Sequence, residues 1–230
     1  MFYLGLDLGQ ASDYTALAVL EKVAQVAPPP QEPVIVRTRD LWRDGQPIPS
    51  PPPAPLPAHY HVRHLQRYPL GTAYPAIVKS VGDMLTRPEL RGSRLVIDAT
   101  GVGRPVLDMF RAARLKPVGV TITGGSQPVE VDSMWFNTPK RDLVSTMQVL
   151  LQAERLKIAA TLPDAAVLTQ ELLNFQVKIT DAANDVYGVW REGLHDDLVL
   201  SVAMAAWYAE YRPKRLYFDD IPAVSYYNPI

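Results

Sequence analysis

Short apolar segments of strand length alternate with longer segments of helical periodicity along most of this chain of 230 residues. Residues 2–8 and 15–21 read as two strands joined by a short link, and 59–67 alternates as a third strand. The later elements are expected as helix 74–86, strand 94–98, helix 104–115, strand 117–123, helices 139–156 and 165–175, strand 185–191 and helix 196–211. This order predicts an α/β fold, in which three antiparallel strands and then parallel strands form one mixed sheet flanked by helices on both faces.

Proline is concentrated in one segment, because 11 of the 22 prolines lie between residues 28 and 57. Proline runs favour polyproline II and cannot enter the interior of a sheet. We therefore expect residues 28–58 to be a Pro-rich loop insertion in a domain that spans 1–212. The tail over 213–230 is expected to be irregular. A surface loop is the more common role of such a segment, and a ligand for an SH3-type domain is the alternative.

Aspartates stand at the ends of two buried strands. Asp7 lies within Leu4-Gly5-Leu6-Asp7-Leu8, and Asp98 ends Leu95-Val96-Ile97-Asp98. Burying an ionised carboxylate is costly unless it is paired or binds a cation. Each aspartate alone could instead cap a helix or bond loop amides, so neither establishes a site by itself.

A third acidic feature opens the last expected helix, where Asp196 and Asp197 precede an apolar, alanine-rich segment. Aspartate is favoured at a helix N-cap and in the first turn. One acid is enough to cap the helix, so helix capping does not explain the second acid. Small residues would let this helix pack closely on the sheet and deliver its first turn to the strand ends: Ser201, Ala203, Ala205 and Ala206.

Several carboxylates that meet at one point repel each other and need cations to neutralise them. Oxygen ligands of this kind suit Mg²⁺ or Mn²⁺. Two such ions about 3.5–4 Å apart can activate a water and stabilise the leaving oxygen of a phosphodiester. The chain has no cysteine, which excludes disulfides and thiolate metal sites.

Four segments occur in a diagnostic order: Gly5-Leu6-Asp7-Leu8-Gly9, Asp13-Tyr14-Thr15-Ala16, Val96-Ile97-Asp98-Ala99-Thr100-Gly101-Val102-Gly103 and His195-Asp196-Asp197-Leu198-Val199. Together they resemble the nuclease domain of phage large terminase subunits, which are DNA-packaging motor proteins with an RNase H-like fold. The resemblance spans residues 5 to about 210. It implies that Asp7, Asp98 and Asp197 are the catalytic metal ligands. By the same resemblance Asp196 is a neighbouring or second-metal ligand and Asp13 an auxiliary acid.

The resemblance also implies an activity and partners. The activity is metal-dependent endonucleolytic cleavage of double-stranded DNA with low sequence specificity, in the host cytoplasm. The partners are DNA, an ATPase domain or subunit of the packaging motor, the portal and the small terminase. No Gly-x-x-x-x-Gly-Lys-Ser/Thr loop is present, so we expect an excised nuclease domain or a free-standing nuclease. We expect neither a signal peptide nor a membrane span.

The formal net charge is -1, whereas proteins that bind nucleic acid tightly by themselves are usually basic. Another domain or subunit is therefore expected to supply much of the affinity for DNA. Possible DNA contacts at the active edge are Arg104, Lys140, Arg141 and Arg191. Two positive charges at a helix start oppose the helix dipole, which favours a phosphate contact for Lys140-Arg141, with a solvated helix end as the alternative.

The segment 126–137 is expected to form a flap that carries Trp135 and Phe136, although these aromatics could equally be core residues. Three other functions remain open. A RuvC-like resolvase of branched DNA would share the fold and the acids. An actin-like ATPase or sugar-kinase-type domain would share the glycine-flanked aspartates, and a non-catalytic module would have inactive acids.

Overall fold

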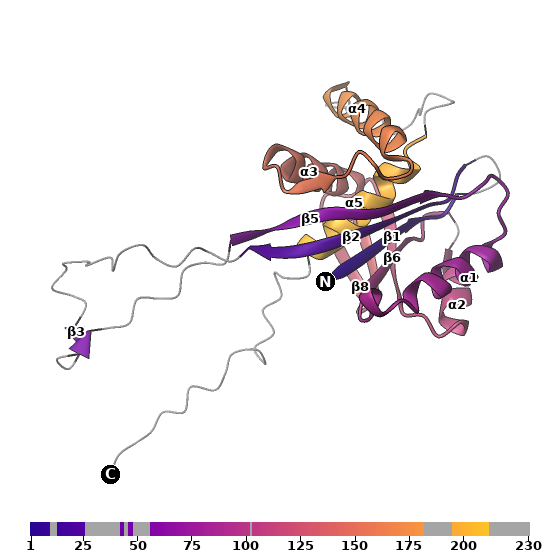
Figure 1. Ribbon diagram of the computed structural model, residues 1–230, viewed down its shortest axis with the longest axis horizontal. Coiled ribbons are helices and arrows are strands. Elements are labelled where there is room, and N and C mark those ends of the chain that lie inside the picture. Colours follow the sequence, from indigo (N-terminus) through magenta and orange to yellow (C-terminus); the bar gives the residue numbers. More distant parts are fainter. Residues whose placement is uncertain are drawn as a thin grey trace, which may run out of the picture.

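The computed structural model describes residues 1–9, 13–25, 42–43, 46–47, 56–101, 103–181 and 195–211 (Figure 1). Most of these residues form one eight-stranded mixed sheet with helices on both faces. The predicted α/β class is therefore confirmed. No helix in this described part of the chain is both long enough and apolar enough to cross a bilayer.

The order of strands across the sheet is β10 (Leu156–Ile158), β5 (Leu56–Arg67), β2 (Ala16–Gln25), β1 (Phe2–Asp7), β6 (Arg94–Asp98), β7 (Pro117–Thr123), β9 (Trp135–Pro139) and β8 (Val129–Asp132). Strand β2 is antiparallel to both of its neighbours, and β8 is antiparallel to β9. The other neighbouring strands are parallel. The expected sequence of antiparallel and then parallel strands is thus present. A separate pair joins β3 (Trp42–Arg43) to β4 (Gln46–Pro47).

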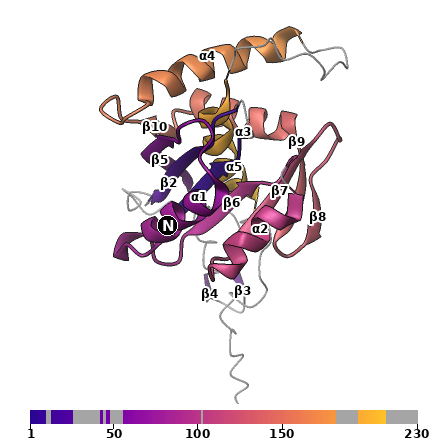
Figure 2. The ribbon, with the colours of Figure 1, turned by 90° about the vertical axis from the view of Figure 1, so that its right-hand side faces the viewer.

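Two layers of helices cover the sheet (Figures 1 and 2). On one face lie α5 (Asp197–Tyr211), α3 (Lys140–Gln152) and α4 (Ala165–Asp181), with α5 against the central strands. On the other face lie α1 (Tyr74–Leu85) and α2 (Gly103–Ala112), and a short 3-10 turn, η1 (Pro88–Leu90), follows α1. Each face has its own apolar core, so the strands between them are buried on both sides.

Side chains of β1 alternate between the two cores, as the pleat of a strand requires. Tyr3 packs in the core beneath α5, whereas Leu4 and Leu6 pack in the core beneath α1 and α2. Gly5 points at α5, and a Cβ added there would lie 1.8 Å from the backbone oxygen of Ser201. The small residues expected in this helix are all buried, which confirms that α5 packs closely on the sheet.

Two expected elements differ from the structure. The expected flap is instead the β8–β9 hairpin at one edge of the sheet, where Phe136 is completely buried and Trp135 partly buried. The helix expected over 139–156 ends at Gln152, because the chain turns at Glu154 with a φ of 52° and enters β10.

Strand β5 begins at Leu56, which lies inside the range expected to be Pro-rich loop. The rest of that loop, apart from β3 and β4, lies outside the described residues. So do the strand expected over 185–191 and the C-terminal tail over 213–230.

Candidate functional site

Asp7 and Asp98 are the last residues of two neighbouring central strands. Because these strands are parallel, both acids lie at the edge of the sheet formed by the carboxyl ends of the strands, called the acidic edge below. Strands β1 and β6 are parallel, and their last paired residues are Leu6 and Ile97, so each aspartate is the next residue along its strand. Both side chains are nearly buried, with 8% and 7% of their surface exposed. Since side chains alternate along a strand, Asp7 lies on the same face as Gly5, the face that α5 covers.

Helix α5 brings its first turn to this edge. It runs antiparallel to β1, because Ser201 lies against Gly5 while Tyr208, two turns later, contacts the ring of Tyr3. Asp197 is the first residue of α5 and is 6% exposed. Asp196 is partly exposed and accepts the first backbone hydrogen bond of the helix with its carbonyl oxygen. Of these two acids, Asp197 is the buried one.

The pKa values record that the four carboxylates share one region. Burial raises the pKa of Asp7 well above its usual range, and the charges of Asp98, Asp197 and Asp196 raise it further. Burial also raises the pKa of Asp98, and raises that of Asp197 to about 6. The structure therefore places these four acids within electrostatic reach of one another.

Some of this repulsion is offset by local partners. The carboxylate of Asp98 accepts a hydrogen bond of 2.7 Å from the Thr100 amide. The Lys140 ammonium lies 3.4 Å from the Asp196 carboxylate, and its charge lowers the pKa values of Asp7 and Asp98 against the effect of burial. Two of the acids are thus partly compensated by the protein itself.

The other two acids are less well satisfied. Oδ2 of Asp197 lies 3.5 Å from the Arg67 guanidinium and 3.8 Å from the His195 ring, yet this buried oxygen has no hydrogen-bond partner. Within the described residues, the Asp7 carboxylate makes no hydrogen bond and no ion pair. A buried carboxylate in this state is costly, and a bound cation would relieve the cost.

The donor set fits a hard divalent cation in kind, because it consists of carboxylate oxygens, and the buried Asp7 carboxylate is opposed by three neighbouring negative charges. In the conformation of the described residues, no three acidic or histidine side chains already form a group that could hold a metal ion. Side-chain rotation would have to bring the oxygens to a common point. The residues and their charges therefore suit a cation, while the coordination geometry is not preformed.

The other residues named from the sequence are distributed around this edge. Asp13 is exposed, and its charge adds a minor increase to the pKa of Asp197, after burial and the nearer charges. Arg104 is exposed and lies over the Trp135 ring, 5.4 Å from its centroid. Arg141 points away to the Ser126 carbonyl, so of the Lys140-Arg141 pair only Lys140 reaches the acids. Arg191 lies outside the described residues.

Two residues that the sequence did not single out complete the surroundings of Asp197. Glu171 of α4 is 5% exposed, and burial raises its pKa to about 7 against the opposing effects of the Val199 amide and Arg67. Arg67, at the end of β5, forms ion pairs with both Glu171 and Asp197. A signal for Glu171 was available, since Leu168 and Leu172 share its helix face and an acid on an apolar stripe is unusual.

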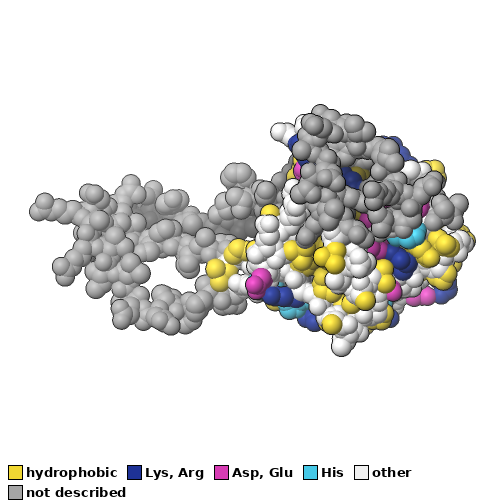
Figure 3. Space-filling model, turned by 90° about the horizontal axis from the view of Figure 1, so that it is seen from above, with side chains coloured by type: hydrophobic (Ala, Val, Ile, Leu, Met, Phe, Trp, Pro, Cys, Tyr) yellow, Lys and Arg dark blue, Asp and Glu magenta, His cyan; other side chains and the backbone are white. Residues whose placement is uncertain are grey.

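The charges on the molecular surface are mixed. On the face viewed in Figure 3, Lys and Arg side chains of the described residues are interspersed with acidic ones instead of forming one continuous basic area. This distribution agrees with the net charge of -1. It gives no independent sign of a strong DNA-binding surface on that face.

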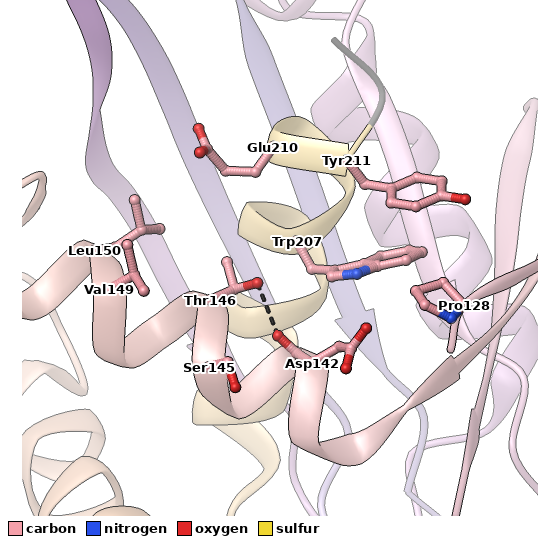
Figure 4. Close-up of a pocket in the computed structure, with 9 residues that line it drawn as sticks. All are labelled: Pro128, Asp142, Ser145, Thr146, Val149, Leu150, Trp207, Glu210 and Tyr211. Carbon is pink, nitrogen blue, oxygen red and sulfur yellow. Dashed lines mark hydrogen bonds between the residues drawn. The ribbon is translucent and has the colours of Figure 1, made fainter. Parts of the chain in front are cut away.

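A hollow of about 420 Å³ lies between α3 and the far end of α5 (Figure 4). It is distinct from the acidic edge, because the 15 residues of α5 span on the order of 20 Å. Glu210, one of its two acids, is already bound by Tyr60 and Arg155. The hollow is lined by Pro128, Asp142, Ser145, Thr146, Val149, Leu150, Trp207, Glu210 and Tyr211.

No protein-family model and no curated protein matches this chain. Among solved structures, the chain is similar to the large terminase nuclease from thermophilic phage G20c, at 17% identity and a TM-score of 0.49, over 89% of this chain and 80% of that one. It is also similar to the Mn-soaked human cytomegalovirus terminase nuclease domain, at 12% identity and a TM-score of 0.42, over 89% of this chain and 81% of that one.

Proposed function

We propose that this chain is a divalent-metal-dependent endonuclease that hydrolyses double-stranded DNA with low sequence specificity, as the nuclease part of a viral DNA-packaging terminase. The carboxylate cluster carries the proposal. Asp7, Asp98 and Asp197 approach one edge of the sheet from three elements, and burial raises the pKa of each. Perturbed acids grouped in this way are more typical of a functional site than of a structural one.

Each acid has a role in this proposal. Asp7, Asp98 and Asp197 would hold Mg²⁺ or Mn²⁺, with Asp196 as a ligand of a second ion and Asp13 as an auxiliary acid. Such ions, when bound, supply an activated water and stabilise the leaving oxygen of the phosphodiester. The Thr100 amide holds the Asp98 carboxylate in place with a hydrogen bond of 2.7 Å. Lys140, beside Asp196, places a positive charge where a phosphate would approach.

The partners in this proposal are double-stranded DNA, an ATPase domain or subunit of a packaging motor, the portal and the small terminase. The net charge of -1 favours a division of labour, in which another domain or subunit holds the DNA and this chain cuts it. The local DNA contacts in this proposal are Arg104, Lys140, Arg141 and Arg191. The place of action would be the host cytoplasm.

The direct test is cleavage of supercoiled plasmid in Mn²⁺, in Mg²⁺ and in EDTA. Wild type should nick and linearise the plasmid with either metal and not in EDTA, and Asp98→Asn should be inactive. Asp108→Asn is the matched control, because Asp108 is an exposed acid of α2 paired only with Arg111 among the described residues. Cleavage by Asp98→Asn at the wild-type rate, or cleavage in EDTA, would refute the proposal.

Two further substrates separate the rival functions. A four-way junction cut much faster than linear duplex would identify a branched-DNA resolvase. Tight ATP binding without cleavage of any DNA would identify an ATPase or kinase-type domain.

A further inference from the structure

Arg67 is held from several sides at the end of β5. Its amide donates to the Asp164 carboxylate at 3.3 Å, and its guanidinium lies over the Tyr14 ring, 4.7 Å from the centroid. The guanidinium also pairs with Glu171 and Asp197. Only 19% of the side chain is exposed, so this arginine is part of the interior and is poorly placed to contact a substrate.

Glu171 joins three elements around Asp197. It extends from α4, accepts a hydrogen bond of 3.0 Å from the Val199 amide in the first turn of α5, and binds Arg67 of β5. Amides in the first turn of a helix have no partner within the helix, so this bond fixes the start of α5. Glu171 therefore contacts both the first turn of α5 and the Arg67 guanidinium.

Each member of the Arg67–Asp197 ion pair has a buried atom without a hydrogen-bond partner, and the two atoms are complementary in kind. One is the donor Nε of Arg67 and the other is the acceptor Oδ2 of Asp197. Nη2 of the same guanidinium lies 3.5 Å from that oxygen, so Arg67 is close enough to offer Asp197 a charge-assisted hydrogen bond. With one oxygen bound by Arg67, Asp197 can offer its other oxygen to a cation.

We infer that Arg67 and Glu171 form a positioning pair, which fixes the Asp197 carboxylate and the first turn of α5 so that Asp197 presents one oxygen to a metal ion. This inference rests on the proposed metal-dependent function. Groups that orient a metal ligand typically contribute 10–100-fold to metal affinity. The pair acts through Asp197, so its loss should weaken metal binding more than it slows cleavage at saturating metal.

The experiment measures Mn²⁺ binding to the whole chain by electron paramagnetic resonance, together with the dependence of plasmid cleavage on Mn²⁺ concentration. Arg67→Met and Glu171→Ala should weaken Mn²⁺ binding by ~10–100-fold. Cleavage at saturating Mn²⁺ should stay within about tenfold of wild type. Arg67→Lys and Glu171→Gln should retain part of the Mn²⁺ affinity. The lysine keeps the positive charge beside Asp197, and the glutamine keeps an oxygen that accepts the hydrogen bond from the Val199 amide.

The matched control is Arg63→Met, which removes an exposed arginine from the same strand, where it pairs with Glu21. Mn²⁺ affinity should be unchanged in that variant. If Arg67→Met or Glu171→Ala does not fold, Arg67→Lys and Glu171→Gln still decide the question, since each should bind Mn²⁺ measurably more weakly than wild type. Unchanged or tighter Mn²⁺ binding in the folded variants would overturn the positioning pair.

Failure of the proposed function gives a different result. If wild type cleaves and Asp98→Asn does not, the nuclease proposal stands whatever the Arg67 variants do. If wild type neither binds Mn²⁺ nor cleaves DNA, the nuclease proposal and the positioning pair fall together.

Discussion

Gly5 of β1 and Ser201 of α5 are in such close contact that a Cβ on Gly5 would lie 1.8 Å from the Ser201 carbonyl oxygen. This contact allows the backbone of α5 to rest directly on β1. Because Asp197 lies one helical turn before Ser201 and Asp7 lies two residues after Gly5, the same contact brings the two aspartates to one edge. The close packing of Gly5 on Ser201 thus also sets the position of Asp197 relative to Asp7.

Gly5→Ala should therefore be destabilising, because the added methyl group would meet backbone that cannot move without shifting α5. We expect a loss of about 1–3 kcal/mol in the free energy of unfolding, measured with urea. Gly82→Ala in α1 is the control: its Cβ would be 4.0 Å from the nearest atom, Leu115, and it should be neutral or stabilising. Equal stability of Gly5→Ala and wild type would show that α5 does not lie this close to β1.

Asp7→Asn should raise the stability of the metal-free chain while abolishing cleavage. The substitution removes a buried charge that three other aspartates repel. At pH 8 in EDTA we expect a gain of at least about 1 kcal/mol, measured by urea denaturation. Asp98→Asn should gain less, because its carboxylate accepts a hydrogen bond from Thr100. A loss of stability in Asp7→Asn would indicate a structural role for this acid.

Glu210→Ala should lower the stability of the chain and leave cleavage unchanged, which is the opposite of the result expected for Asp7→Asn. Burial raises the pKa of Glu210, but hydrogen bonds from Tyr60 and Arg155 more than compensate, so the pKa is lowered overall. We expect a loss of about 1 kcal/mol in stability, a modest figure because a third of the side chain is exposed. The rate of plasmid cleavage per folded molecule should be unchanged, and a cleavage defect comparable to that of Asp98→Asn would contradict this assignment.

The metal-free chain should become less stable as the pH rises from about 4 to 7. Burial raises the pKa of Glu171 to about 7 and that of Asp197 to about 6, from ordinary values of 4.5 and 3.8. An acid with a higher pKa in the folded state binds its proton more tightly there, so its contribution is complete below the unfolded pKa and is lost above the folded one. For Glu171 the change corresponds to roughly 3 kcal/mol.

The measurement for this pH dependence is the difference in free energy of unfolding between wild type and Glu171→Gln in EDTA. Carboxylates that do not interact with Glu171 titrate equally in both chains and cancel, whereas the nearby Asp197 and Asp196 are part of the measured difference. Wild type should lose stability relative to Glu171→Gln between pH 4.5 and 7.5. A relative gain over the same range would contradict the raised pKa of Glu171.

The sequence was sufficient to predict the elements that carry Asp7, Asp98 and Asp197. Apolar strands that end in aspartate, and a small-residue helix that begins with two, are local patterns with a direct physical cost if the acids are buried. Which of Asp196 and Asp197 is buried was beyond the sequence, because it depends on the rotation of α5 against the sheet. The structure shows that Asp197 is the buried acid.

The partners of the acids were less accessible to sequence analysis. Arg67 and Glu171 are separated from Asp197 by 130 and 26 residues of chain, and their contacts depend on how β5, α4 and α5 converge. The ion pair of Lys140 with Asp196 was not foreseen, and a phosphate contact of Lys140 remains a prediction. The β8–β9 hairpin was missed because its β8 strand has only 4 residues and is largely exposed, so its pairing with β9 is not evident from the local pattern.

The most direct test of the shared cation site is a titration of Mn²⁺ into the metal-free chain, followed by electron paramagnetic resonance, for wild type and Asp7→Asn. The account predicts saturable binding by wild type and a loss of at least about tenfold in affinity for Asp7→Asn. Wild-type and variant curves that coincide, or the absence of saturable binding, would contradict the convergence of these carboxylates on a common metal ion.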